Sequence, residues 1–223
     1  MEVTLLSVLT LGFILGIKHA IEPDHVIAVS TIASRSKKLW HASLAGVFWG
    51  IGHTATLFII GIILILMKNE ISDKWSLTLE FFVGIMLVYL GTVSILSVRK
   101  EKEDTHTHHT HLPKDVKKKQ GYYKSLIVGL IHGLAGSAAM VLLTMSTVHT
   151  VWHGVLFILI FGLGTIAGML FFTTLIGIPF ILSINRFSMS RSLIFLTGGI
   201  SALFGLYYMY DLGFNEGLFA LWI

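Results

Sequence analysis

The chain contains no cysteine and few charged residues. Without thiols it can form no disulfide and can run no thiol–disulfide electron relay, so that class of membrane function is excluded. Charged side chains make up 13% of the 223 residues and hydrophobic ones 54%, a composition far from that of soluble domains. The sequence therefore predicts an integral membrane protein. It also lacks a phosphate-binding loop, a His-Glu-x-x-His site and a nucleophile elbow, so we do not expect an enzyme.

Long apolar runs, by contrast, are abundant. About 20 apolar residues cross a bilayer as a helix, and six stretches meet that length: residues 3–33, 40–67, 75–98, 122–148, 151–184 and 190–212. We expect an all-α protein with about six transmembrane helices. The chain begins without the positive start of a secretory signal, so the first run is expected to be retained. The first and fifth runs are too long for a straight crossing, and Pro23 and Pro179 predict that these helices are kinked or broken.

Positive charge is concentrated in alternate loops. The positive-inside rule therefore makes loops one, three and five cytoplasmic and places both termini outside. Because loop placement accounts for the net charge of +4, no nucleic-acid partner is expected. We predict a multi-pass protein of the cell membrane, surrounded by lipid; a homo-oligomer is compatible with the sequence. The basic residues of these loops are Arg35, Lys37 and Lys38; Arg99, Lys100, Lys102, Lys114, Lys117, Lys118, Lys119 and Lys124; and Arg186 and Arg191.

The two halves of the chain resemble each other. The segment Gly-Ile-Lys-His at 16–19 matches Gly-Leu-Ile-His at 129–132, and Trp-His at 40–41 matches Trp-His at 152–153, with offsets of 113 and 112. We predict two three-helix repeats, residues 1–98 and 122–223, in opposite orientations, as in many secondary transporters. Residues 99–121 would form a cytoplasmic linker. Its tract His-Thr-His-His-Thr-His at 106–111 is either a solvated segment or a weak metal-capturing one.

Four ionisable residues lie in the middle of the first apolar run: His19, Glu22, Asp24 and His25. Because such groups are costly in hydrocarbon, they indicate a functional site, although polar pairing between helices is the alternative. Imidazole and carboxylate ligands suit divalent first-row transition metals. In a straight helix Asp24 points away from the other three. An opening of the helix at Pro23 would let it turn toward them, and would also free the carbonyl of residue 19.

Two further histidines are candidate ligands. His53 lies near the middle of the second run, after glycines that allow close helix approach, and we expect it to be an additional ligand rather than only a hydrogen-bonding group. His132 is the repeat mate of His19 but is not followed by acids, so a role as ligand or gate and a role as a partner of the ligands are equally open. The predicted metal set is His19, Glu22, Asp24, His25, His53 and His132.

The pattern of His19, four residues, then Asp24-His25, followed by Gly52-His53, resembles the signature of the nickel/cobalt permease family. The sequence that continues through residues 27–31 is similar to that of the urease-accessory membrane branch of the family. This resemblance implies a transporter for Ni²⁺, with Co²⁺ as a second substrate, no permanently bound cofactor, and a functional link to urease maturation. An interior-negative potential contributes about 2.3 kcal/mol per charge per 100 mV, about twice that for a divalent ion, which favours uptake.

Two other functions remain open from the residues alone. Two histidines at membrane depth could be axial ligands in a redox or haem-handling protein. Alternatively, the same repeat plan could export a small anion or an amino acid that pairs with histidine and Lys18.

Overall fold

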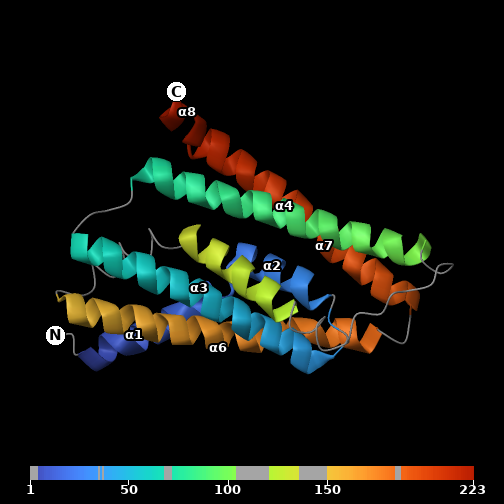
Figure 1. Ribbon diagram of the computed structural model, residues 1–223, viewed down its shortest axis with the longest axis horizontal. Coiled ribbons are helices and arrows are strands. Elements are labelled where there is room, and N and C mark those ends of the chain that lie inside the picture. The colour runs from blue at the N-terminus through green and yellow to red at the C-terminus, as the bar shows by residue number, and fades with distance from the viewer. Residues whose placement is uncertain are drawn as a thin grey trace.

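The computed structural model describes residues 5–34, 36, 38–67, 72–103, 121–135, 150–183 and 187–223, and all regular elements in these ranges are helices. Figure 1 shows them as a layered bundle of long, roughly aligned rods. The elements are α1 (Leu5–His19), α2 (Pro23–Ala33), α3 (Leu39–Met67), α4 (Asp73–Glu103), a helix over 121–135, α6 (Val151–Ser183), α7 (Phe187–Tyr210), the π-helical turn η2 (Asp211–Asn215) and α8 (Leu218–Trp222).

Several of these helices have the length and apolar composition needed to cross a membrane. Four qualify individually: Leu39–Met67, Asp73–Val98, Val151–Ser183 and Ser190–Asn215. The bent pair α1 and α2 qualifies as a fifth. The helix over 121–135 ends where the described residues end, so it is not counted among these spans. The expectation of an all-α, multi-pass membrane protein is confirmed with four to five spans.

The first span is broken, as expected, immediately before Pro23. The axes of α1 and α2 differ by 57°, and Pro23 occupies the first turn of α2, where its missing N–H is not needed. The carbonyl of His19 is not left free, because the backbone N–H of Glu22 donates to it at 3.1 Å. By contrast, α6 is one continuous helix with Pro179 inside it, so of the two alternatives, a kinked or a broken helix, the break is wrong for the fifth span. Only one turn of helix follows Pro179, so one missing hydrogen bond is tolerated there.

Two pairs of helices pack closely through glycines. In the pair α3 and α6, Gly46 lies against Thr173 and Gly162 lies against Thr54, so the two helices run antiparallel. In the pair α4 and α7, the backbones meet at Gly91 and Gly198 and again at Gly84 and Gly205, so this pair is antiparallel as well.

The short helix α2 joins the two pairs. It contacts α3 and α6 on one side and α4 and α7 on the other, while α1 packs along α6. Gly16 of α1 lies so close to the backbone of Phe161 that a side chain larger than hydrogen would collide with it. Helix α2 therefore lies between the two helix pairs, while Ile21, Glu22 and Pro23 at the break remain exposed.

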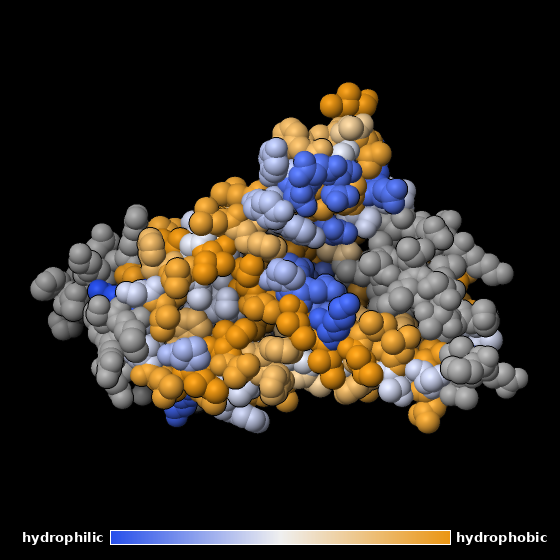
Figure 2. Space-filling view, turned by 180° about the vertical axis from the view of Figure 1, so that it is seen from behind, coloured by the Kyte–Doolittle hydropathy of each residue, from blue (hydrophilic) through white to orange (hydrophobic). Residues whose placement is uncertain are grey.

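The surface agrees with a bilayer as solvent. Large apolar side chains such as Leu6 and Leu182 are exposed on the outside of the helices. Figure 2 shows that hydrophobic residues cover most of one face, while hydrophilic residues gather near its middle. Helix α4 extends to Glu103, beyond the expected start of the linker at residue 99. The rest of the linker up to residue 120, with the histidine tract at 106–111, lies outside the described residues, as do Arg35, Lys37 and Arg186.

Candidate metal centre

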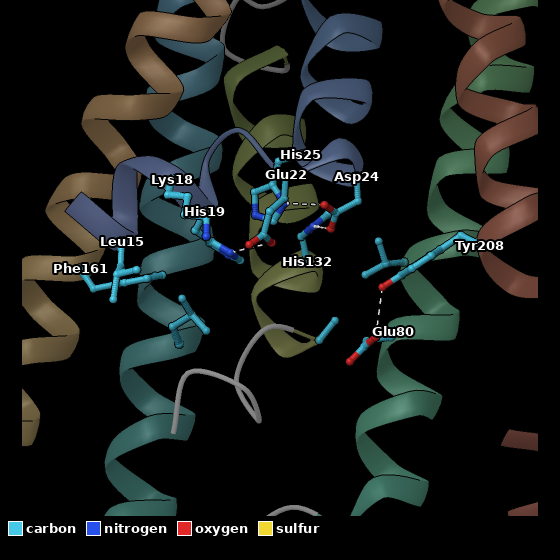
Figure 3. Close-up of a pocket in the computed structure, with 13 residues that line it drawn as sticks. Leu15, Lys18, His19, Glu22, Asp24, His25, Glu80, His132, Phe161 and Tyr208 are labelled. Carbon is cyan, nitrogen blue, oxygen red and sulfur yellow. Dashed lines mark hydrogen bonds and ion pairs between the residues drawn. The ribbon is translucent and has the colours of Figure 1, made fainter. Parts of the chain in front are cut away.

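The six residues predicted from the sequence come together at the break between α1 and α2. His19 ends α1, Glu22 precedes α2, and Asp24 and His25 lie in the first turn of α2. His53 comes from the middle of α3. His132 comes from the helix over 121–135 (Figure 3). Side chains from four separate helices thus meet at one point.

Three histidines form the centre of this cluster. One ring nitrogen from each of His19, His25 and His53 lies within 4.8 Å of the others. The Nε2 atoms of His19 and His53 are 3.1 Å apart. Two nitrogen ligands at about 2.1 Å from one ion stand about 3 Å apart when the angle at the ion is about 90°. The spacing of these two imidazoles therefore suits a shared transition-metal ion.

Carboxylates orient two of these rings. Nδ1 of His19 lies 2.8 Å from Oε2 of Glu22, and Nδ1 of His25 lies 3.1 Å from Oδ1 of Asp24. Because an ionised carboxylate only accepts hydrogen bonds, each Nδ1 donates, and in the neutral ring Nε2 then keeps its lone pair. Nε2 of His25 is buried and has no hydrogen-bond partner among the described residues. Both rings are thus held in the tautomer that offers Nε2 to a metal ion.

His132 occupies a different position. Its Nε2 donates to Oδ2 of Asp24 at 2.8 Å, so Asp24 accepts hydrogen bonds from two histidines at once. Asp24, His25 and His132 also form a second group with metal-ligand spacing, but their contacting atoms are engaged with one another. His132 therefore fixes Asp24, and Asp24 fixes His25.

Three of the four histidines in the cluster are buried. The side chains of His25, His53 and His132 are 1%, 0% and 1% exposed, whereas Glu22 is about half exposed at the edge. Trp49, fully buried on α3, stacks on His53 with ring centres 5.7 Å apart. The same indole stands perpendicular to His25 at 4.9 Å. The indole thus holds two candidate ligand rings in place.

The partial charges at the two helix ends that meet at the break suit the groups beside them. His19 lies at the carbonyl end of α1, which carries partial negative charge and favours a cation. Asp24 lies in the first turn of α2, whose partial positive charge favours a carboxylate. The break therefore places a cation site and its orienting carboxylate at the two helix ends that suit them.

The cluster opens into a pocket of about 300 Å³. Lys18, Glu22 and His19 lie on one side of the pocket in Figure 3, and Glu80 of α4 and Tyr208 of α7 lie on the other. The remaining lining residues are Leu15, Asp24, His25, Leu57, Val83, His132, Ala135 and Phe161. The histidine cluster is thus connected to a cavity whose opposite wall is also polar.

Sequence reasoning missed three of these side chains. Glu80 had a detectable signal, because it is a lone carboxylate within the apolar run 75–98. Tyr208 and Trp49 had none, since aromatic residues are common in membrane spans. Only the packing of α7 and α3 brings Tyr208 to the pocket and Trp49 to the histidine rings.

The fold and the site define a class: a multi-pass helical membrane protein with a buried imidazole–carboxylate site suited to a transition-metal ion. A family model described as the transmembrane region of cytochrome c biogenesis protein matches residues 8–207. The urease accessory protein UreH of Bacillus sp. strain TB-90 is 62% identical over 225 residues, covering 100% of this chain and 99% of that protein. The chain belongs to this urease-accessory family and to the wider family of that transmembrane region.

More distant relatives fit the same class. A Methanocaldococcus jannaschii protein named as a nickel/cobalt efflux system is 29% identical over 206 residues, which cover 88% of this chain and 89% of that protein. The Arabidopsis thaliana chloroplast protein FOR GROWTH AND FERTILITY 1 is 29% identical over 181 residues, and this chain spans about half of its length, 48%. No solved structure matches the chain. The urease accessory and nickel/cobalt relatives are named as accessory or transport proteins and not as enzymes, in agreement with the sequence.

Proposed function

We propose that the protein carries Ni²⁺, and Co²⁺ as a second substrate, across the cell membrane into the cytoplasm. The observation that carries this proposal is the triad of His19, His25 and His53 at a broken membrane span, with two Nε2 atoms 3.1 Å apart. Nickel binds nitrogen ligands more tightly than manganese or iron(II), and copper binds them more tightly still, so selection must come from geometry and supply.

In this proposal the six residues have two kinds of role. His19, His25 and His53 bind the ion through Nε2. Glu22 and Asp24 hold the rings of His19 and His25, and also lower the electrostatic cost of a divalent ion. His132 positions Asp24. The relatives named for urease accessory function and for nickel/cobalt efflux support a metal substrate and a supply route to urease maturation.

The proposed architecture is a pair of inverted three-helix repeats, residues 1–98 and 122–223, joined by a cytoplasmic linker at 99–121, with both termini outside. The antiparallel packing of α3 with α6, and of α4 with α7, supports it, because these are the second and third helices of the two repeats. His19 and His132, at equivalent positions of the repeats, both reach the centre, as expected for a site at a repeat interface.

Uptake is favoured by the membrane potential. A divalent ion moving inward across 100 mV gains about 4.6 kcal/mol, twice the value for one charge, and this suffices for entry without ATP. The relative named for efflux makes outward transport the opposite outcome of the test. The test therefore measures the direction in which the ion moves.

The test is ion flux into proteoliposomes that contain a metal-sensitive dye and carry an imposed interior-negative potential. Wild type is expected to take up Ni²⁺ at a rate that falls when the potential is reversed. His19→Ala and His25→Ala are each expected to lower the rate at least tenfold, because each removes a ligand. His153→Ala, which changes a histidine in the first turn of α6, is the matched control and should transport at the wild-type rate. Undiminished flux in both ligand variants would overturn the proposal.

The match to a cytochrome c biogenesis region makes haem handling the second candidate. Two axial nitrogens on opposite sides of an iron stand about 4 Å apart, twice a metal–nitrogen bond. The 3.1 Å between His19 and His53 is too short for that arrangement, and the chain has no cysteine for thiol chemistry. Purified protein with stoichiometric Ni²⁺ and no Soret band would exclude haem, whereas a Soret band that disappears in His53→Ala would favour it.

A further inference from the structure

A carboxylate stands apart from the histidine cluster on the opposite wall of the same pocket. Glu80 belongs to α4, and Figure 3 shows it below Tyr208, across the cavity from His19 and His132. The hydroxyl of Tyr208 donates to Oε2 at 3.1 Å, and that of Ser76 donates to Oε1 at 3.4 Å. Each carboxylate oxygen thus has one hydroxyl partner.

This carboxyl group has no ion-pair partner among the described residues, and its hydrogen-bonding capacity is only partly used. No basic side chain of the described residues forms an ion pair with it, although ionisable groups at membrane depth usually pair or mark a path for ions. A carboxylate has about four lone-pair sites, and the two hydroxyls occupy two of them. The remaining acceptor capacity is available to a cation in the pocket.

Packing fixes this group in place. The backbones of α4 and α7 meet at Gly84 and Gly205, and the hydroxyl of Ser201 donates to the carbonyl of Leu87 at 2.8 Å. Tyr208 lies less than one turn after Gly205, so its side chain starts from a closely packed part of this pair. The hydroxyl that holds Glu80 is therefore carried by a helix that is packed closely against α4.

Glu80 is also closer to one membrane surface than the histidines are. The end of α3 at Met67 and the start of α4 at Asp73 lie on the same side of the membrane, because both helices span it and follow each other in the chain. Glu80 is seven residues inside that end of α4, about 11 Å, whereas His53 is fourteen residues inside α3, about 21 Å. An ion coming from that side meets Glu80 first.

We infer that Glu80, held by Tyr208, is a second binding station for the transported divalent cation, between the membrane surface and the histidine cluster. This inference rests on the proposed metal transport. With the loop after α3 outside, as the charge distribution predicts, Glu80 is the outer station during uptake. It gathers the ion through carboxylate oxygen and passes it to His19, His25 and His53.

The test separates capture of the ion at Glu80 from binding of the ion at the histidines. Ni²⁺ affinity of purified protein is measured by calorimetry, and initial uptake rates are measured in proteoliposomes over a range of Ni²⁺ concentrations. For Glu80→Gln we expect a Kd at the cluster within threefold of wild type, an uptake rate at least tenfold lower at low Ni²⁺, and recovery toward the wild-type rate at saturating Ni²⁺. Tyr208→Phe keeps the charge and should lower the low-concentration rate about threefold. Asp73→Asn, which removes an exposed carboxylate in the first turn of α4, is the control.

Each result decides the matter. If Glu80→Gln transports like wild type at low Ni²⁺ while His25→Ala is inactive, the second station is wrong and metal transport stands. If Glu80→Gln lowers affinity and maximal rate together, Glu80 supports the fold or the cluster instead, and the inference fails. If wild type moves no Ni²⁺ above empty liposomes, both the proposed function and this inference fail. Should Glu80→Gln not fold, Glu80→Asp and Tyr208→Phe give the same comparison.

Discussion

Replacing Asp24 by asparagine tests how the cluster is held. The two oxygens of Asp24 accept hydrogen bonds from Nδ1 of His25 at 3.1 Å and from Nε2 of His132 at 2.8 Å. An asparagine keeps one accepting oxygen and turns the other into an NH₂ donor. One of the two rings then faces a donor with its own N–H, and must change tautomer or turn away.

The magnitude follows from the role assigned to Asp24. Loss of a group that orients a metal-binding histidine typically costs 10- to 100-fold in metal affinity. That corresponds to about 1.4–2.7 kcal/mol of binding free energy. If Asp24 were itself a ligand, the variant would also lose a metal bond, and the loss would exceed 100-fold. The geometry therefore predicts an intermediate loss for Asp24→Asn.

The assay is calorimetric titration of Ni²⁺ into purified protein in detergent at neutral pH. Asp73→Asn, the same change at an exposed position in the first turn of α4, controls for loss of one negative charge. We expect a 10- to 100-fold weaker Kd in Asp24→Asn with unchanged stoichiometry, and wild-type binding in Asp73→Asn. An affinity within twofold of wild type would refute the orienting role, and complete loss of binding would make Asp24 a ligand.

Two further outcomes are expected from the same geometry. His132→Ala should weaken Ni²⁺ binding 10- to 100-fold without abolishing it, because His132 holds Asp24 and not the ion; calorimetry showing no binding at all would contradict this. Gly16→Ala should lower the melting temperature of the purified protein by about 2–10 °C, since the added methyl meets the backbone of Phe161, whereas Gly199→Ala adds it in open space and should change little; equal melting curves would contradict the packing.

Most of the membrane-spanning pattern and the first half of the site could be predicted from local sequence. Apolar length is a property of consecutive residues, so the spans at 40–67 and 151–184 agree with α3 and α6 to within one residue at each end. The group around Pro23 was visible because ionisable residues are rare in such runs. The turn of Asp24 toward the cluster followed from the expected break at Pro23.

The remaining features depend on packing between distant segments. The sequence predicted Asp24 as a metal ligand and Glu22 as a ligand or a local negative charge; in the structure their oxygens contact the Nδ1 atoms of His25 and His19. Whether a carboxylate binds the ion or orients a histidine depends on where its side chain points. The spacing of residues in the sequence does not show this. The pairing of Glu80 with Tyr208 joins residues 128 positions apart. Pro179 lies near the end of the continuous helix α6, where a proline is tolerated. The length of the apolar run and the presence of a proline did not show this.

The close approach of four helices at the cluster has a consequence for biogenesis. His19 is inserted early, whereas His132 comes from a later segment of the chain, so an incomplete chain cannot assemble the orienting set around Asp24. Under the proposed function, the orienting set is complete only when both halves have been inserted and packed. Ni²⁺ affinity of the purified protein would then report correct assembly as well as transport competence.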